Sequence, residues 1–222
     1  MNRTNNRKSA VIIGVLSVCL LMCQAAVGQP PDPQLQIQEA SNRLRTVLQQ
    51  DGELLMQDPG YVYRVADEVL LPNIDMERMS SLVLGRHWRK ASSQQKQAFS
   101  AEFTRLLVRS YSAVIQELGK WEVRFPPSRL QPDSKRTVVQ SEVIRPGAQP
   151  VKIDYYMYLN EDHWLAYDVK IEGISLVTNY RSSFAKVIRQ KGIDGLVAAL
   201  QAKNDAAAPK QGDRVALNSK AR

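Results

Sequence analysis

Few side chains in this 222-residue sequence have the types and spacing of a catalytic or metal-binding site. His87 and His163 are the two histidines, and neither has a second ligand at the spacing that zinc sites use. Cys19 and Cys23 are the two cysteines, and both lie in an apolar stretch near the N-terminus. The sequence contains neither a G-x-S-x-G nucleophile turn nor a glycine-rich phosphate loop. These observations argue against metal-dependent, thiol-dependent and nucleotide-dependent chemistry.

Carboxylates are a possible exception, because paired acids can perform hydrolysis. They gather near the end of the predicted sheet, at Asp154, Asp162, Asp168 and Glu172. Alternation along the predicted strands places Asp154 and Asp168 opposite the apolar faces. This position favours a solvated face over a catalytic pair.

A short basic segment is the other charged feature. Arg86, Arg89 and Lys90 flank Trp88. They could contact a phosphate or an acidic partner, or they could form ordinary protein surface. The remaining charge is spread along the chain, so a formal charge of +8 does not by itself require a nucleic-acid partner.

Residues 1–28 have the three parts of a secretory signal peptide. Three cations precede an apolar run over 10–22, and small residues lead to an expected cleavage after Gly28. The run is shorter than the roughly 20 residues that span a bilayer. We therefore predict a cleaved signal peptide and a cysteine-free mature chain outside the cytoplasm. Loss of the three cations would lower its formal charge to +5.

Residues 29–203 are expected to form a single α+β domain in which helices precede and follow four strands. Strands joined by short turns imply an antiparallel meander. Apolar periodicity predicts helices over 33–57, 61–71, 75–84 and 92–119, a helix that starts at 175 or 179 and ends at 192, and a last helix over 193–203. It predicts strands over 121–125, 137–144, 151–159 and 163–171. Residues 204–222 have little to bury and are predicted to be a disordered tail.

The sheet and the helix over 92–119 both present broad apolar faces, and they are expected to face each other. Close packing alone would explain these faces. The alternative is a hollow that holds an apolar ligand, which is a common form of small-molecule site.

Three segments, taken together in their order and spacing, resemble the MlaC family of phospholipid-binding proteins, also known as toluene-tolerance proteins of Gram-negative envelopes. The resemblance extends over about residues 35–200. It is carried by Leu70-Leu71-Pro72 with Leu82-Val83-Leu84-Gly85, Trp88 and Ala91, by residues 164–176, and by residues 191–196.

The resemblance implies a fold, a cargo and partners. The fold would be a curved, NTF2-like antiparallel four-stranded sheet wrapped by about six helices around an apolar pocket. The protein would be a periplasmic carrier of glycerophospholipid between the outer and inner membranes, with lipid as cargo, no cofactor and no enzymatic activity. Its implied partners are MlaD, the MCE-domain subunit of an inner-membrane ABC transporter, and the outer-membrane lipoprotein MlaA with porins.

A lipid carrier must cover the acyl chains, because about 30 exposed methylenes would cost on the order of 24 kcal/mol in water. A pocket near the top of the usual range of ~300–1,000 Å³ is therefore expected. The lining residues predicted from the helix are Phe103, Leu107, Tyr111 and Val114, and those predicted from the sheet are Val139, Val143, Ile153, Tyr155, Met157, Val169 and Ile171.

Two other hypotheses remain open at this point. An NTF2-like enzyme would use Asp168 or Glu172 as a base and Tyr155 as a proton donor, and it requires a carboxylate that points into the cavity. An envelope interaction module would instead have a solid core and no bound lipid.

Overall fold

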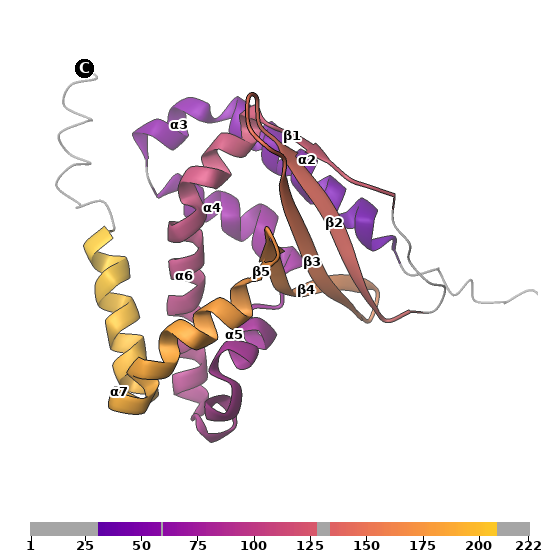
Figure 1. The fold of residues 1–222 in the computed structure, drawn as a ribbon. Helices are drawn as coiled ribbons and strands as arrows, with labels where there is room; N and C mark the ends of the chain where they lie inside the picture. Colours follow the sequence, from indigo (N-terminus) through magenta and orange to yellow (C-terminus); the bar gives the residue numbers. More distant parts are fainter. Residues whose placement is uncertain (1–30, 59, 128–133, 208–222) are drawn as a thin grey trace, which may run out of the picture. The chain divides into compact units, whose positions relative to one another are not determined.

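The fold is given by a computed structural model that describes residues 31–58, 60–127 and 134–207 (Figure 1). The predicted signal peptide over 1–28 lies outside these residues. Helices come first, a sheet follows, and a long helix closes the described chain. The structure therefore confirms the α+β class and the antiparallel sheet. No helix of the described part is long and apolar enough to cross a bilayer.

The first helical segment is interrupted, whereas one helix was predicted over 33–57. Helix α2 (Pro33–Gln50) and helix α3 (Gly52–Gln57) are separated at Asp51, whose φ of −107° and ψ of 23° are not helical. The Asp51 carboxylate accepts a hydrogen bond from the Tyr61 hydroxyl. At the start of α2, the Asp32 carboxylate caps the helix by accepting from the Gln34 amide at 2.8 Å.

The next segment is irregular. Helix α4 (Tyr61–Val65) continues into a π-helical turn, η2 (Ala66–Leu70), and a 3₁₀ turn, η3 (Leu71–Asn73). Pro72 lies in this last turn, where proline prevents a regular helix from continuing. Helix α5 (Met76–Leu84) ends at Gly85, whose positive φ of 55° suits glycine, and the 3₁₀ turn η4 (Gly85–Lys90) follows.

Helix α6 (Ser93–Glu117) has the capping box that its sequence predicts. The Ser92 hydroxyl accepts from the Gln95 amide at 3.1 Å, and the Gln95 side chain accepts from the Ser92 amide at 3.0 Å. The 3₁₀ turn η5 (Leu118–Lys120) follows the helix. Figure 1 shows the first arm of the last helix crossing α6 and the second arm running alongside it.

Five strands form one antiparallel sheet in the order β1-β2-β3-β4-β5. The first four agree with the predicted strands, and the fifth was missed because it has only two residues. The strands are β1 (Glu122–Arg124), β2 (Arg136–Ile144), β3 (Val151–Asn160), β4 (His163–Ile171) and β5 (Ile174–Ser175).

A bulge in β4 changes which side chains face inward. Tyr156 pairs with Asp168 and Met157 pairs with Ala166, so Tyr167 has no partner in the register. The extra residue keeps Ala166 and Val169 on the same inner face, although strict alternation would separate them. On the outer face, the Arg78 guanidinium lies over the rings of Tyr158 and Tyr167, at 4.1 and 4.8 Å from their centroids.

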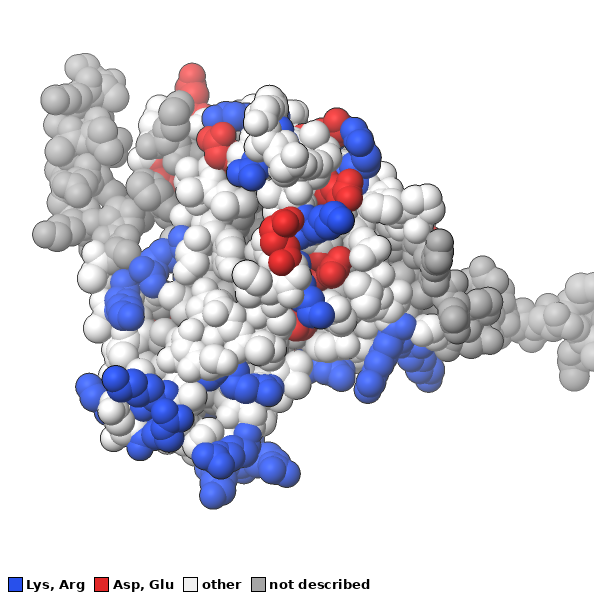
Figure 2. Space-filling view, viewed as in Figure 1, with Lys and Arg blue, Asp and Glu red and all other residues white. Residues whose placement is uncertain are grey.

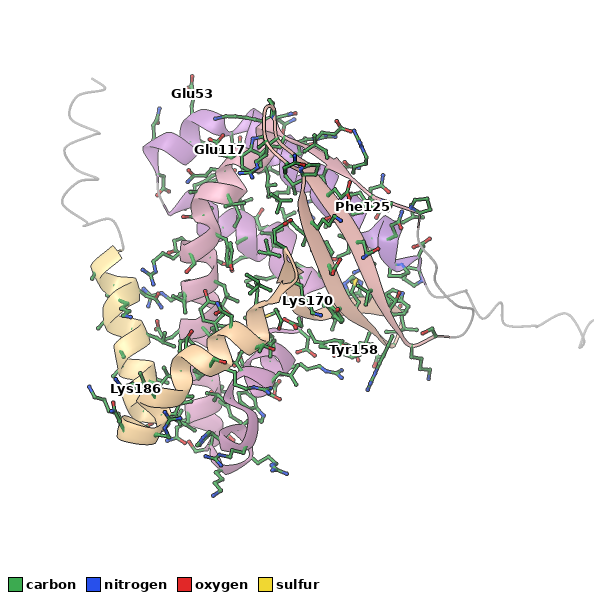
Figure 3. The ribbon with its side chains drawn as sticks, viewed as in Figure 1. Glu53, Glu117, Phe125, Tyr158, Lys170 and Lys186 are labelled. Atoms are coloured by element: carbon green, nitrogen blue, oxygen red, sulfur yellow. The ribbon has the colours of Figure 1, made fainter. Side chains whose placement is uncertain are left out.

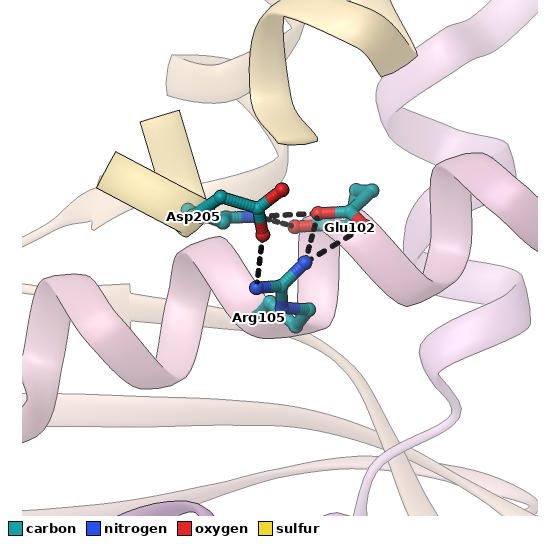
Figure 4. Close-up of polar contacts among 4 residues, drawn as sticks. Glu102, Arg105 and Asp205 are labelled. Carbon is teal, nitrogen blue, oxygen red and sulfur yellow. Dashed lines mark hydrogen bonds and ion pairs between the residues drawn. The ribbon is translucent and has the colours of Figure 1, made fainter. Parts of the chain in front are cut away.

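Helix α7 (Leu176–Ala207) is bent at Gly192, where φ is 67° and ψ is −170°. This glycine is the predicted boundary between the last two helices. The prediction of disorder from 204 is wrong for 204–207, because the helix continues and Asn204 is buried. The Asn204 side chain donates to the Glu102 carboxylate at 2.7 Å. Arg105 bridges Glu102 and Asp205 at 3.0 and 2.8 Å (Figure 4).

Candidate functional site

An apolar cavity of about 120 Å³ lies between the inner face of the sheet and helix α2. Its walls come from α2, the irregular segment before α5, η5 and four strands. The lining residues are Ile37, Ala40, Ser41, Leu44, Leu70, Asn73, Ile74, Leu118, Val123, Val143, Ile153, Tyr155, Ala166 and Val169. Apolar side chains dominate this set, so the cavity suits hydrocarbon.

One face of helix α2 forms one wall of the cavity. Ile37, Ala40, Ser41 and Leu44 follow the spacing of three and four residues that brings helical side chains together. The two middle residues are short, and they leave space where larger side chains would reach the sheet. Both ends of α2 are tied to the domain: Gln36 donates to the Trp164 carbonyl at 2.7 Å, and Gln49 donates to the Gly119 carbonyl at 2.9 Å.

The irregular segment after α4 supplies a second wall, through Leu70, Asn73 and Ile74. Asn73 donates to the Val69 carbonyl at 3.0 Å and accepts from the Gln36 side chain at 3.0 Å. Ile74 forms a parallel β-bridge with Ala166 of β4. These bonds hold the π-helical and 3₁₀ turns and the residue after them against the sheet, beside the cavity. Apolar periodicity over 61–71 indicated Leu70, whereas no periodic pattern in the sequence indicated Asn73 or Ile74.

The sheet supplies the opposite wall. Val143, Ile153, Tyr155 and Val169 line the cavity. As lipid contacts, these four residues remain predictions. Val139 and Met157 also face inward, but they are almost fully buried in a packed cluster with Trp164, Ile37 and Ala166. Ile171 is partly buried and does not line the cavity.

The predicted helical wall differs from the observed one. The expectation that α6 faces the hollow is wrong, because the cavity contacts α2 and none of the predicted α6 residues. Phe103 is 0% exposed inside a solid cluster against which Leu107 also packs, and Tyr111 packs against another cluster. Val114 is 47% exposed at the surface. As lipid contacts, these residues remain predictions.

Four aromatic rings make the cluster around Phe103 solid, and we call them the aromatic core: Phe99, Phe103, Tyr180 and Phe184. The rings of Phe99 and Phe103 stack with centroids 5.6 Å apart. Phe184 meets Phe103 edge to face at 6.1 Å, and Tyr180 meets it at 5.2 Å. This packing joins α6 to α7 and leaves the apolar face of α6 occupied.

Tyr155 brings the main polar group of the sheet wall into the cavity. Burial raises the pKa of its phenol, and the neighbouring Ser141 hydroxyl partly offsets that rise. The phenol therefore stays neutral at physiological pH. Ser41 and Asn73 are the other polar lining residues, and no carboxylate lines the cavity within the described residues.

The two carboxylates considered as candidate bases are engaged elsewhere. Asp168 accepts from the Ser175 hydroxyl at 2.6 Å and from the Val177 amide at 3.1 Å, which fixes the start of α7. Glu172 is exposed and accepts from the Lys152 amide. The described residues also contain no cluster of three or more metal-ligating side chains. The arrangement can bind hydrocarbon, and it offers no acid–base pair in the cavity.

The fold and the cavity define a class of small α+β binding proteins in which a curved antiparallel sheet covers an apolar site. Comparison with known proteins identifies the family. The sequence model of the MlaC protein family matches residues 38–202, and the chain belongs to this family. The predicted resemblance is thereby confirmed.

Similar proteins agree over most of the chain. The intermembrane phospholipid transport system binding protein MlaC of Haemophilus influenzae is 22% identical over 90% of this chain and 95% of its own length. Toluene tolerance protein ttg2D of Pseudomonas putida is 24% identical over 71% of this chain and 74% of its own. A phospholipid-binding protein from Ralstonia solanacearum, solved with a phospholipid, is 29% identical. Its structure matches with a TM-score of 0.74, and the match covers 79% of this chain and 98% of the Ralstonia solanacearum chain.

Proposed function

We propose that this protein is a phospholipid carrier that holds acyl chains in the cavity under the sheet and shuttles the lipid between the outer and inner membranes. The observation that carries the proposal is the apolar cavity between α2 and the inner sheet face. The Ralstonia solanacearum relative, which matches this fold over 98% of its length, was solved with a phospholipid. Transport of this kind maintains the lipid asymmetry of the outer membrane.

The cavity must widen to take this cargo. Its volume of about 120 Å³ is below the ~300–1,000 Å³ of typical ligand pockets, and the expectation of a pocket near the top of that range is therefore wrong for this structure. Ala40 and Ser41 form the middle of the α2 wall, whereas Ile37, Leu44 and Leu48 of the same helix are buried and pack it against the domain. The hydrogen bonds of Gln36 and Gln49 lie near its ends.

A carrier changes no covalent bond, and it needs no cofactor beyond its cargo. This fits a cavity whose described lining lacks carboxylates and whose nearest candidate, Asp168, accepts two hydrogen bonds at the start of α7. The hypothesis of an NTF2-like enzyme requires the opposite arrangement. We accordingly propose that the protein is not an enzyme.

Family membership supports the rest of the proposal. We place the protein in the periplasm, exported by cleavage of residues 1–28. We propose that it receives and delivers lipid through the MlaD subunit of an inner-membrane ABC transporter and through the outer-membrane lipoprotein MlaA with porins. Nucleic acid is not among the proposed partners.

Transfer of lipid between vesicles tests the carrier function directly. Donor vesicles would contain a fluorescent phosphatidylglycerol, and the protein would be purified from cells that express the full-length gene. We expect the protein to accelerate transfer to acceptor vesicles. Ile153→Asp places a charge in the cavity wall and should abolish the acceleration, whereas Val138→Asp on the exposed side of β2 should not. Equal transfer with and without protein would contradict the proposal.

A further inference from the structure

Six exposed cations gather at one end of the domain, remote from the cavity. Three come from η4 and three from the bend of α7, segments about a hundred residues apart in the sequence. We call this set the basic end: Arg86, Arg89, Lys90, Lys186, Arg189 and Lys191. Only the η4 half was recognisable as a basic segment in the sequence. Figure 2 shows Lys and Arg gathered at the lower end of the molecule, whereas acidic and basic residues mix over the upper part.

Contacts between the two segments hold the basic end together. The Arg181 side chain of α7 donates to the Leu82 carbonyl of α5 at 2.8 Å, immediately before η4. The Gln95 side chain of α6 donates to the Asp194 carboxylate, just after the bend, at 2.9 Å. Trp88 of η4 packs against the same cluster as α7. The cations therefore project from a rigid base, and Figure 3 shows Lys186 extending from α7 into solvent.

The charges of the basic end are not neutralised within the described part of the chain. The ion pairs found there join other cations to acids, and none involves the six residues. The nearby Asp194 accepts from Gln95, and Glu77 lines a separate shallow hollow with Trp88 and Lys96. Six uncompensated cations on one end create a positive potential that attracts an anionic surface.

We propose that the basic end docks the protein on a bilayer surface that contains anionic phospholipid. The cations project from a turn and a helix bend, and they line neither the cavity nor the hollow beside Trp88. Such a convex set of long, exposed side chains suits the mobile, dispersed charges of lipid headgroups. None of the six cations lines either of the two hollows described above, so neither hollow would present them to the ordered side chains of an acidic protein. This second site is distinct from the proposed cargo site.

Flotation with lipid vesicles tests the proposal. The protein would be purified from cells that express the full-length gene. It would be mixed with vesicles of pure phosphatidylcholine or with vesicles that contain about 30% phosphatidylglycerol, which gives roughly the charge density of an anionic membrane. We expect binding only to the anionic vesicles, and its loss in high salt. R86Q/R89Q/K90Q and K186Q/R189Q/K191Q should each lower the partition coefficient about 100-fold.

A matched control separates the site from net charge. R43Q/R136Q/K152Q removes the same charge from exposed positions on α2, β2 and β3 and should lower partitioning less than tenfold, as expected for charges farther than a Debye length from the surface. Equal losses in all three variants would overturn the proposal, as would equal binding to both vesicle types or to neither. Lipid extracted from the same preparations reports the cargo site, so failure of docking and failure of the carrier function are distinguishable.

Discussion

The cavity between α2 and the sheet and the aromatic core are both built from apolar faces, but the first is open and the second is filled. Between α2 and the sheet, short side chains at Ala40 and Ala166 leave an open volume of about 120 Å³. Between α6 and α7, the rings around Phe103 fill the space, and Phe103 has no exposed surface. Side-chain size at a few facing positions therefore decides whether an apolar interface becomes a site or a core.

Truncation in the aromatic core should have the largest effect on stability. Phe103→Ala removes a fully buried ring and should lower the free energy of unfolding by about 3–5 kcal/mol. Denaturant titration of preparations with matched lipid content would measure this. Val114→Ala, on the exposed side of the same helix, should change the value by less than about 0.5 kcal/mol. Similar losses for the two variants would show that the core is not packed as described.

Charge in the cavity wall should remove cargo. Val169→Asp places an unpaired carboxylate among apolar lining residues, and we expect a loss of lipid affinity of about 5- to 150-fold, which is what a burial cost of about 1–3 kcal/mol produces. Lipid per protein would be measured after extraction, and circular dichroism would confirm folding. Val138→Asp on the exposed side of β2 serves as the matched control. Full lipid content in a folded Val169→Asp protein would contradict the assigned site.

Replacing an alanine by leucine should have opposite effects on stability in the cavity wall and in a packed interface. Ala66 is fully buried, and Ala66→Leu should cost about 1–3 kcal/mol of stability through overpacking. Ala40→Leu fills part of the cavity and should leave stability unchanged or raise it by up to about 1 kcal/mol, while lipid content falls. Thermal unfolding and lipid extraction would measure both. Destabilisation by Ala40→Leu equal to that by Ala66→Leu would mean that the wall has no free space.

The smallest effect concerns Tyr155 and alkaline pH. Burial raises the pKa of this phenol in the folded state, so the unfolded chain loses its proton first as pH rises. The stabilising contribution is fully present below the unfolded pKa of about 10 and is lost as pH rises through the folded value. Tyr155→Phe should therefore show a shallower decline of stability above pH ~10. Parallel pH profiles for the two proteins would contradict burial of the phenol.

Much of the architecture was predictable because its signals are local. The capping box at Ser92 and Gln95, the glycine at 192 and the alternation in β2 and β3 act within a few residues of chain. They correctly indicated a long helix, a bend and a half-buried meander. The two-residue strand β5 and the break at Asp51 have weaker local signals, and both were missed.

The site was only partly predictable, because periodicity shows which face is apolar but not which element it meets. The face of α6 was correctly identified as apolar, yet α7 and the other helices cover it. Ala166 was missed because the bulge at Tyr167 breaks alternation, and Asn73 was missed because it lies in irregular backbone. Val143, Ile153, Tyr155 and Val169 do line the cavity, since β2, β3 and the end of β4 keep strict alternation, and as lipid contacts they remain predictions.

The most direct test of the carrier function is native mass spectrometry of the protein purified from its envelope without detergent, followed by lipid extraction under denaturing conditions. A phospholipid carrier should show a bound mass that matches a diacyl phospholipid and is released only on unfolding. Val169→Asp should lose this mass, while Val138→Asp should retain it. A bare polypeptide mass for the parent protein, or equal occupancy in the two variants, would contradict the carrier function.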